Sequence, residues 1–169
     1  MSIRKIVKYG DPVLRKRCKP VKEIDEKIQE LVRDMFETMY NAPGVGLAAN
    51  QIGVNLSIAV IDLQQGGKKN PIVLINPKVV ELKGRIFEEE GCLSIPGMLS
   101  KVKRWSYAKV EALNELGLPM TYVGEGFLAR ALQHETDHLN GKFYVDRLPL
   151  LKRLSMFSRV RKKKKQERW

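Results

Sequence analysis

The chain has few of the residues that most often carry metal and redox chemistry. Its 169 residues include only two histidines and two cysteines. Two cysteines make no disulfide framework, which favours a reducing, cytoplasmic setting. No apolar run approaches the roughly 20 residues of a membrane span, and the first residues lack the long apolar core of a signal peptide. We therefore expect no membrane partner.

Acidic residues are scarce at the C-terminal end. The net charge is +12, but residues 147–169 hold ten Lys or Arg against one acidic residue, Glu167. This basic tail carries +9, which leaves only +3 for the preceding 146 residues. Any attraction to polyanions is therefore confined to the tail, and we expect no DNA partner for the body of the chain.

Helical spacing of apolar residues is clear in three places. One pattern runs from 28 to 40 after the N-cap residue Asp25, one from 128 to 139 before Asn140-Gly141, and one from 150 to 160. Short β-branched runs at 57–63, 72–75, 78–82, 85–89, 107–113 and 119–123 predict strands. Turn residues predict hairpins at 83–84 and 114–117. Strands arranged in hairpins predict an α+β fold with antiparallel sheet, in a single domain over 1–169.

Both histidines lie in the second helical pattern, as His134-Glu135-Thr136-Asp137-His138. Residues four apart project from the same face of a helix, so the two imidazoles can hold one metal ion. Glu135 between them can then activate a water molecule. Two hydrogen-bonded histidines with no metal are the alternative, because this short pattern also occurs by chance.

A catalytic metal site needs a third protein ligand and one open position. The chain has no third histidine, and the only glutamate after His138 is Glu167, in the basic tail. The remaining strong ligand is Cys92, which follows Glu89-Glu90-Gly91. Cys18 has basic neighbours and a nearby proline, so it is the weaker candidate.

Three segments together resemble the signature motifs of the peptide deformylase family, in order and in spacing. They are Gly44-Val45-Gly46-Leu47-Ala48-Ala49-Asn50-Gln51, Glu90-Gly91-Cys92-Leu93-Ser94 and Gln133-His134-Glu135-Thr136-Asp137-His138. The resemblance covers essentially the whole chain. It implies antiparallel sheets packed around a central metal-binding helix, with an N-terminal helix and a basic C-terminal helix.

The resemblance also implies an activity and its residues. Members of this family remove the formyl group from the N-terminal formylmethionine of nascent proteins and release formate. Cys92, His134 and His138 would bind the metal, with Fe²⁺ expected and Zn²⁺, Ni²⁺ or Co²⁺ able to substitute. Glu135 would be the catalytic acid and base, while the side-chain amide of Gln51 and the backbone N–H of Leu93 would donate to the oxyanion.

The substrate side of the site follows from the same resemblance. The backbone at Val45 and Gly46 would pair with the extended peptide, and Phe127, Arg130 and Ala131 would line the methionine pocket. Glu90 is assigned to this side and is also a candidate partner for a ligand histidine. Asp137 would face away from the metal toward a base such as Arg104, or else be a solvated surface acid. Some relatives carry a substrate-contacting arginine where this chain has residues 97–100, Gly-Met-Leu-Ser, so that contact is not expected.

The basic C-terminal tail has two interpretations. In the family the basic C-terminal helix docks on the ribosome, and here residues 150, 151, 154 and 157 would pack on the domain while residues 159–165 reach out. A plain solvated helix end is the alternative role of the tail.

A small HExxH metallopeptidase is the alternative function of the whole chain. A nucleic-acid module with a structural metal is less favoured, because such a metal usually has four protein ligands.

Overall fold

Five antiparallel strands form the central sheet of the structure, a computed structural model that describes residues 2–166. They are β1 (Gly46–Ala48), β2 (Ile58–Ile61), β3 (Ile72–Lys83), β6 (Tyr107–Leu113) and β7 (Pro119–Glu125), adjacent in that order. All four strand pairs are antiparallel. The predicted α+β class with antiparallel sheet is confirmed.

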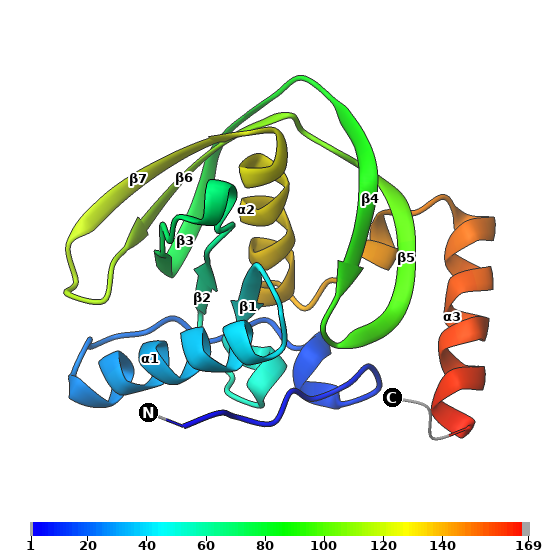
Figure 1. The fold of residues 1–169 in the computed structure, drawn as a ribbon, viewed down its shortest axis with the longest axis horizontal. Helices are drawn as coiled ribbons and strands as arrows, with labels where there is room; N and C mark the ends of the chain where they lie inside the picture. The colour runs from blue at the N-terminus through cyan, green and yellow to red at the C-terminus, as the bar shows by residue number, and fades with distance from the viewer. Residues whose placement is uncertain (1, 167–169) are drawn as a thin grey trace.

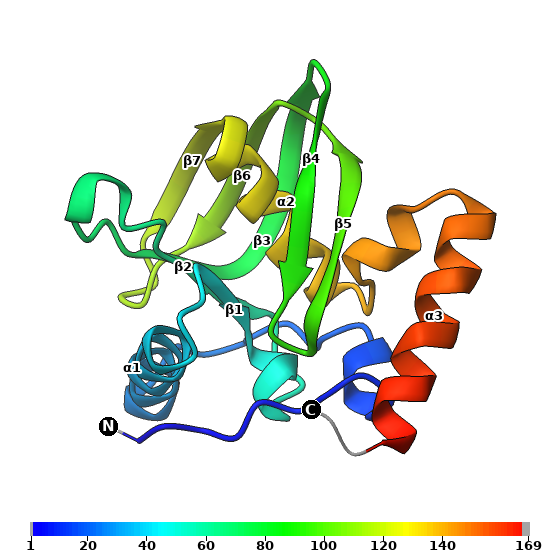
Figure 2. The same ribbon diagram turned by 45° about the vertical axis from the view of Figure 1, so that its right-hand side comes forward.

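Two helices cover the two faces of this sheet. Along β2, Ala59 and Ile61 join one apolar cluster with α2 (Gly126–Leu139), whereas Ile58 and Val60 join another with α1 (Glu26–Asn41). Successive side chains of a strand point to opposite faces, so an unbroken apolar strand implies cover on both sides. In Figures 1 and 2, α2 lies at the centre of the fold and α1 lies below the sheet.

The second sheet is a hairpin of β4 (Ile86–Cys92) and β5 (Ile95–Arg104). Cys92 pairs with Ile95, so Leu93 and Ser94 form a two-residue turn. The hairpin lies on the other side of α2 from the central sheet (Figure 1). The helix that bears both histidines is therefore enclosed by β-structure on two sides.

The local start and end signals of the first two helices are those the sequence predicts. Asp25 precedes α1, and its side chain accepts a hydrogen bond from the backbone N–H of Ile28 at 3.0 Å. Gly141 follows α2 with φ +72°, and a side chain there would collide with the backbone of Arg15. The fold therefore needs glycine at this helix end.

The predicted hairpin at 83–84 is wrong. Residues 72–75 and 78–82 belong to the single strand β3, in which Asn76 has φ +53° and the register shifts between Ile75 and Lys78. The outer half of β3 pairs with β6, and β4 leaves to pair with β5. Strand β5 was not predicted, because Pro96-Gly97 near its start looks like a break in regular structure. The hairpin at 114–117 is confirmed by the pairing of β6 with β7.

The predicted inward face of the last helix, α3 (Leu150–Lys165), is wrong for its three leucines, whereas Phe157 is partly buried against the body of the protein, as predicted. Leu150, Leu151 and Leu154 are 58%, 82% and 54% exposed, and the buried positions are Met156 and Val160. The helix lies outside β5 at the edge of the molecule (Figure 2), so only the face that carries Met156, Phe157 and Val160 packs on the body of the protein. Residues 167–169 of the basic tail, Glu167 included, lie outside the described part of the chain.

Within residues 2–166, no helix is both long enough and apolar enough to cross a membrane.

Candidate active site

The three sequence motifs meet at one cavity of about 610 Å³. The first motif supplies β1 and the short 3₁₀ helix Ala49–Ile52, the second supplies the end of β4 with its turn, and the third lies on α2. Every predicted site residue except the fully buried His138 lines this cavity: Val45, Gly46, Gln51, Glu90, Cys92, Leu93, Phe127, Arg130, Ala131, His134 and Glu135. Segments far apart in the sequence therefore form one concave surface.

The predicted metal ligands face one another. The Nε2 atoms of His134 and His138 are 3.1 Å apart, and the Sγ atom of Cys92 lies 3.2 Å from His138 Nε2. All three ligand atoms lie within 4.8 Å of one another. Around a tetrahedral ion with ordinary Zn–N and Zn–S bond lengths, such donors stand about 3.4–3.6 Å apart. One thiol and two imidazoles at this spacing fit a single divalent cation.

His134 is held by a buried carboxylate. Its Nδ1 lies 3.0 Å from Glu90 Oε2, so Nε2 is the ring nitrogen available to the predicted metal site. Burial alone would raise the pKa of Glu90, but hydrogen bonds from His134 and Arg104 outweigh burial and lower the pKa to about 2. Glu90 thus contacts a ligand histidine through its carboxylate while its residue borders the cavity.

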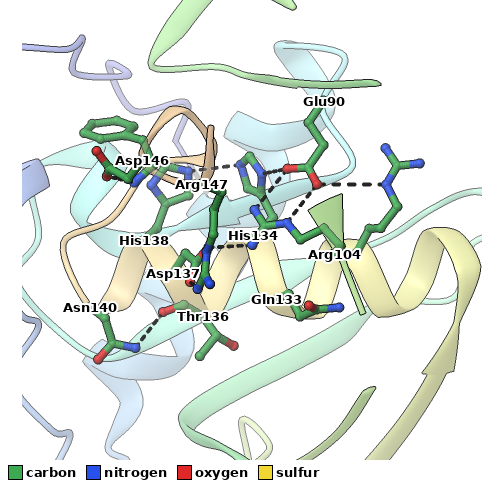
Figure 3. A network of polar contacts seen from close by, with 12 residues as sticks. Glu90, Arg104, Gln133, His134, Thr136, Asp137, His138, Asn140, Asp146 and Arg147 are labelled. Carbon is green, nitrogen blue, oxygen red and sulfur yellow. Dashed lines mark hydrogen bonds and ion pairs between the residues drawn. The ribbon is translucent and has the colours of Figure 1, made fainter. Parts of the chain in front are cut away.

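Arg104 joins two buried carboxylates. Its Nε donates to Glu90 at 2.8 Å and its Nη1 donates to Asp137 at 2.5 Å, with only 1% of its side chain exposed. Asp137 also accepts from Arg147 at 2.6 Å. Figure 3 shows Glu90 between His134 and Arg104, with Arg147 reaching Asp137. Asp137 is therefore paired with Arg104, as the first of the two interpretations had it, and is not a solvated surface acid.

Glu135 points into the cavity from the face of α2 nearest β1. Its residue is 4% exposed, and its Oε2 atom is buried with no hydrogen-bond partner among the described residues. Burial raises the pKa of this carboxyl to about 7, although the neighbouring His134 works against the increase. Burying a carboxyl with an unsatisfied oxygen costs free energy. A buried carboxyl with a raised pKa in a cavity is typical of a group that transfers protons.

Gln51 is fixed at both ends of its side-chain amide. Its Oε1 accepts from the backbone N–H of Ala48 at 2.9 Å, and its Nε2 donates to Ser94 Oγ at 3.2 Å and to Cys92 Sγ at 3.4 Å. The residue is 2% exposed. The amide N–H groups are thereby aimed at the Cys92–Ser94 segment beside the metal ligands.

The whole chain is similar to known deformylases. The family model described as polypeptide deformylase matches residues 3–154. Peptide deformylase 1 of Clostridium acetobutylicum is 51% identical over 148 residues, which are 88% of this chain and 96% of the relative. The peptide deformylase of Endomicrobium trichonymphae is 47% identical over the full length of both chains. A crystal structure of a peptide deformylase from Legionella pneumophila is 49% identical, covers 98% of each chain and superposes with a TM-score of 0.91.

The chain belongs to the polypeptide deformylase family. It is a hydrolase, and the reaction of the family removes the formyl group from N-terminal formylmethionine. The alternative of a general HExxH metallopeptidase is not favoured. The family is one of metalloenzymes, and Cys92, His134 and His138 are the cluster in this chain that could bind the metal.

The first turns of α2 and the segment before β1 line the part of the cavity assigned to the substrate. Phe127 is 40% exposed at the first turn of α2, and the guanidinium of Arg130 lies 5.3 Å from the centroid of its ring. Arg130 also donates to the backbone carbonyl of Glu89 at 2.7 Å. The charged end of Arg130 is thus tied to β4, and its aliphatic stem is left along the cavity.

Some cavity residues from the N-terminal segment were not predicted from the sequence. Ile6 and Lys8 reach the cavity from the N-terminal segment, and Lys8 Nζ donates to the backbone carbonyl of Leu93 at 3.0 Å. Arg147, which holds Asp137, was also missed. No local signal marks Lys8 or Arg147, because a lysine or arginine in a chain with 31 of them is unremarkable until the fold places it.

Proposed function

We propose that Cys92, His134 and His138 hold one catalytic divalent cation and that Glu135 transfers the proton during deformylation. The observation that carries the proposal is the meeting of three ligand atoms within 4.8 Å beside a buried, unpartnered carboxylate oxygen. The bound cation would supply Lewis acidity toward the formyl oxygen and lower the pKa of water. Neither protease-type third ligand, a histidine or a downstream glutamate, is needed.

The residues of the chain then carry the remaining steps. Glu135 takes a proton from the attacking water as its oxygen bonds to the formyl carbon. It returns this proton to the amine nitrogen as the C–N bond breaks, which yields formate and a free N-terminus. Between these steps the formyl oxygen is an oxyanion, and Gln51 Nε2 and the Leu93 N–H donate to it. Loss of one such donor typically costs about 2.7–4 kcal/mol of barrier.

We propose that the substrate is an extended formylmethionyl peptide lying along β1. Gly46 places its backbone against the carboxylate of Glu135, and a side chain at this position would overlap that carboxylate. Val45, Ala131, Phe127 and the stem of Arg130 supply the apolar surface for the methionine side chain. Glu90 acts on this side only through its contact with His134.

Variants of single residues test these roles. Replacement of Cys92 by alanine should abolish metal retention and formate release from a formyl-Met peptide. Replacement of Gln51 by alanine should leave the metal content unchanged and lower kcat by about 100- to 1000-fold. Full metal content and turnover in Cys92→Ala would show that the ligand set is wrong, whereas normal kcat in Gln51→Ala would remove only the oxyanion role.

We propose that the metal is Fe²⁺, as the family resemblance implies. A thiolate with two imidazoles also accepts Zn²⁺, Ni²⁺ or Co²⁺, so the donor set permits iron without selecting it. Metal analysis of protein purified without oxygen should find about one iron per chain, because thiolate-ligated iron sites are prone to oxidation. A site filled mainly by zinc under those conditions would contradict the choice of iron.

We propose that the basic end of α3 docks on the ribosome, and that the enzyme acts on nascent chains in the cytoplasm as one folded unit over residues 1–169. Arg159, Arg161, Lys162 and Lys165 are exposed, and they could contact rRNA phosphates. Lys163 and Lys164 are already engaged, because their Nζ atoms donate to the carbonyls of Pro96 and Tyr9, each at 3.3 Å. The exposed leucines of α3 described above add apolar surface beside this charge.

Co-sedimentation with 70S ribosomes tests the docking. Changing Arg159, Arg161, Lys162 and Lys165 to glutamine should reduce binding, and binding of the unchanged protein should fall steeply with salt. The matched control changes four exposed lysines of the body, Lys22, Lys27, Lys68 and Lys78, to glutamine. Equal loss in the two variants would mean that net charge, and not the tail, governs binding.

A further inference from the structure

The N-terminal segment lies across the site next to the two proposed oxyanion donors. The backbone N–H of Val7 donates to the carbonyl of Gln51 at 2.8 Å, and that of Tyr9 donates to the carbonyl of Ser94 at 2.9 Å. Between these contacts, Lys8 Nζ donates to the carbonyl of Leu93 at 3.0 Å. Three consecutive residues thus bind both segments that the oxyanion role requires.

The turn at Leu93-Ser94 has little other support for its backbone. It joins β4 to β5 with only two residues, and its two carbonyls accept hydrogen bonds from Lys8 Nζ and from the backbone N–H of Tyr9. Ser94 Oγ accepts from Gln51 Nε2, so the side-chain donor and the turn are also joined to each other. The Leu93–Ser94 peptide, next along the chain from the peptide that carries the Leu93 N–H, is therefore held by the ammonium of Lys8, and Lys8 supplies the one side-chain donor among the three contacts of residues 7–9.

Lys8 is placed inside the site and not at its edge. It is half-buried and lines the cavity together with Gln51 and Leu93. Burial lowers the pKa of Lys8, and the nearby Cys92 works against this change. Partial burial of an ammonium carries a free-energy cost, which a hydrogen bond to a carbonyl offsets.

We propose that Lys8 is a positioning residue for the oxyanion site: it fixes the Leu93-Ser94 turn so that the Leu93 N–H and the Gln51 amide converge on one point. This inference rests on the oxyanion role proposed for Gln51 and Leu93. Hydrogen-bond donors lower a barrier only when they are held at the place where charge develops, and a displacement of about 1 Å can cost 100-fold in rate. A residue that acts this way affects kcat and leaves substrate affinity nearly unchanged.

The test replaces Lys8 by methionine, which keeps the length of the side chain and removes the donor. We expect kcat to fall about 10-fold, less than the loss of a donor itself, with KM and metal content within twofold of the unchanged enzyme. Lys8→Arg, which keeps a donor, should recover kcat to within about threefold. Lys5→Met is the matched control, since Lys5 is exposed on the same segment and should change nothing.

Amide hydrogen exchange supplies a readout that does not depend on turnover. Exchange of the peptide covering residues 92–96 should speed up in Lys8→Met and stay unchanged in Lys5→Met. If Lys8→Met is too unstable to assay, Lys8→Leu, which also lacks a donor, serves as the second variant with the same expectations.

Three results would overturn the proposal. They are unchanged kcat, unchanged exchange of residues 92–96, and a rise in KM confined to substrates with a free C-terminal carboxylate, which would make Lys8 a substrate ligand. The Gln51→Ala variant separates this failure from a failure of the proposed function. If Gln51→Ala is impaired while Lys8→Met is normal, the oxyanion role stands and only the role of Lys8 falls.

Discussion

Helices α2 and α3 are similar in length and carry charge in opposite ways. On α2, Glu135, Asp137 and His138 are all at least 94% buried, between the central sheet and the β4–β5 hairpin. On α3, the charges lie on a helix that buries only Met156 and Val160. Burying a charge is costly unless it is paired, so α2 needs a partner for each charged group, whereas water serves α3. Substitutions on and around α2 should therefore have large effects, and those on α3 small ones.

The largest effect on kcat is expected from substitution of Glu135. Glu135→Gln keeps the shape of the side chain and removes proton transfer, so kcat should fall about 100- to 10,000-fold. Formate release measured beside metal content checks this, and the metal content should not change. A kcat within tenfold of the unchanged enzyme would move the proton-transfer role to another group.

The next effect is expected at Arg104, which holds Glu90 and Asp137. Arg104→Met leaves both buried carboxylates without their shared partner, and losing one member of a buried ion pair typically costs about 3–5 kcal/mol. Denaturant unfolding measures this, and metal titration should show affinity weakened about 10- to 100-fold through Glu90 and His134. Arg33→Met, an exposed change on α1, is the control. Equal stability of the two variants would mean that the α2 network contributes no more than a surface charge.

A smaller, pH-dependent effect is expected at Asp34 of α1. This buried carboxylate accepts from Ser2 and from Arg4, and although burial alone would raise its pKa, those hydrogen bonds lower the pKa overall. A carboxyl whose pKa is lower in the folded state stabilises the fold above its unfolded pKa, about 3.9, and loses this contribution as pH falls through the folded value. Asp34→Asn should thus cost about 1.5–3 kcal/mol at pH 7 and progressively less below about pH 4. Thermal unfolding over this pH range is the measurement, and a difference independent of pH would contradict it.

The smallest effect is expected on the exposed face of α3. Leu151→Gln should change the free energy of unfolding by less than about 0.5 kcal/mol, because the side chain is 82% exposed. Met156→Ala on the opposite face of the same helix should cost about 2–5 kcal/mol, since Met156 is 5% exposed within the cluster under α3. If the two changes cost the same, α3 would not have the buried and free faces described above.

The sequence predicted best where a signal is local and periodic. The N-cap Asp25, the end of α2 at Gly141 and the histidine pair each depend on neighbours within a few residues. The strand pairing of β3 and β4 failed because register depends on distant partners, and a turn at Gly84 does not say which strand follows it in space. The leucines of α3 were misassigned because helical spacing marks a face without saying whether anything covers it.

The residues of the site also differ in whether a local sequence signal marks them. Cys92 and the histidines could be proposed from ligand chemistry, and Gln51 from the resemblance to a family. Lys8 and Arg147 gain their importance from hydrogen bonds that span 85 and 10 positions of sequence. Only the fold brings those partners together, and a residue type common on every surface gives no local sign of such a contact.

The glycine at position 46 limits how this enzyme could be redesigned. Any larger residue there would displace the carboxylate of Glu135. A substitution at position 46 that aims to broaden the peptide preference would therefore remove activity. Position 127 has no such restriction, because Phe127 is 40% exposed at the first turn of α2. Libraries that aim at new N-terminal residues should therefore vary position 127 and leave 46 unchanged.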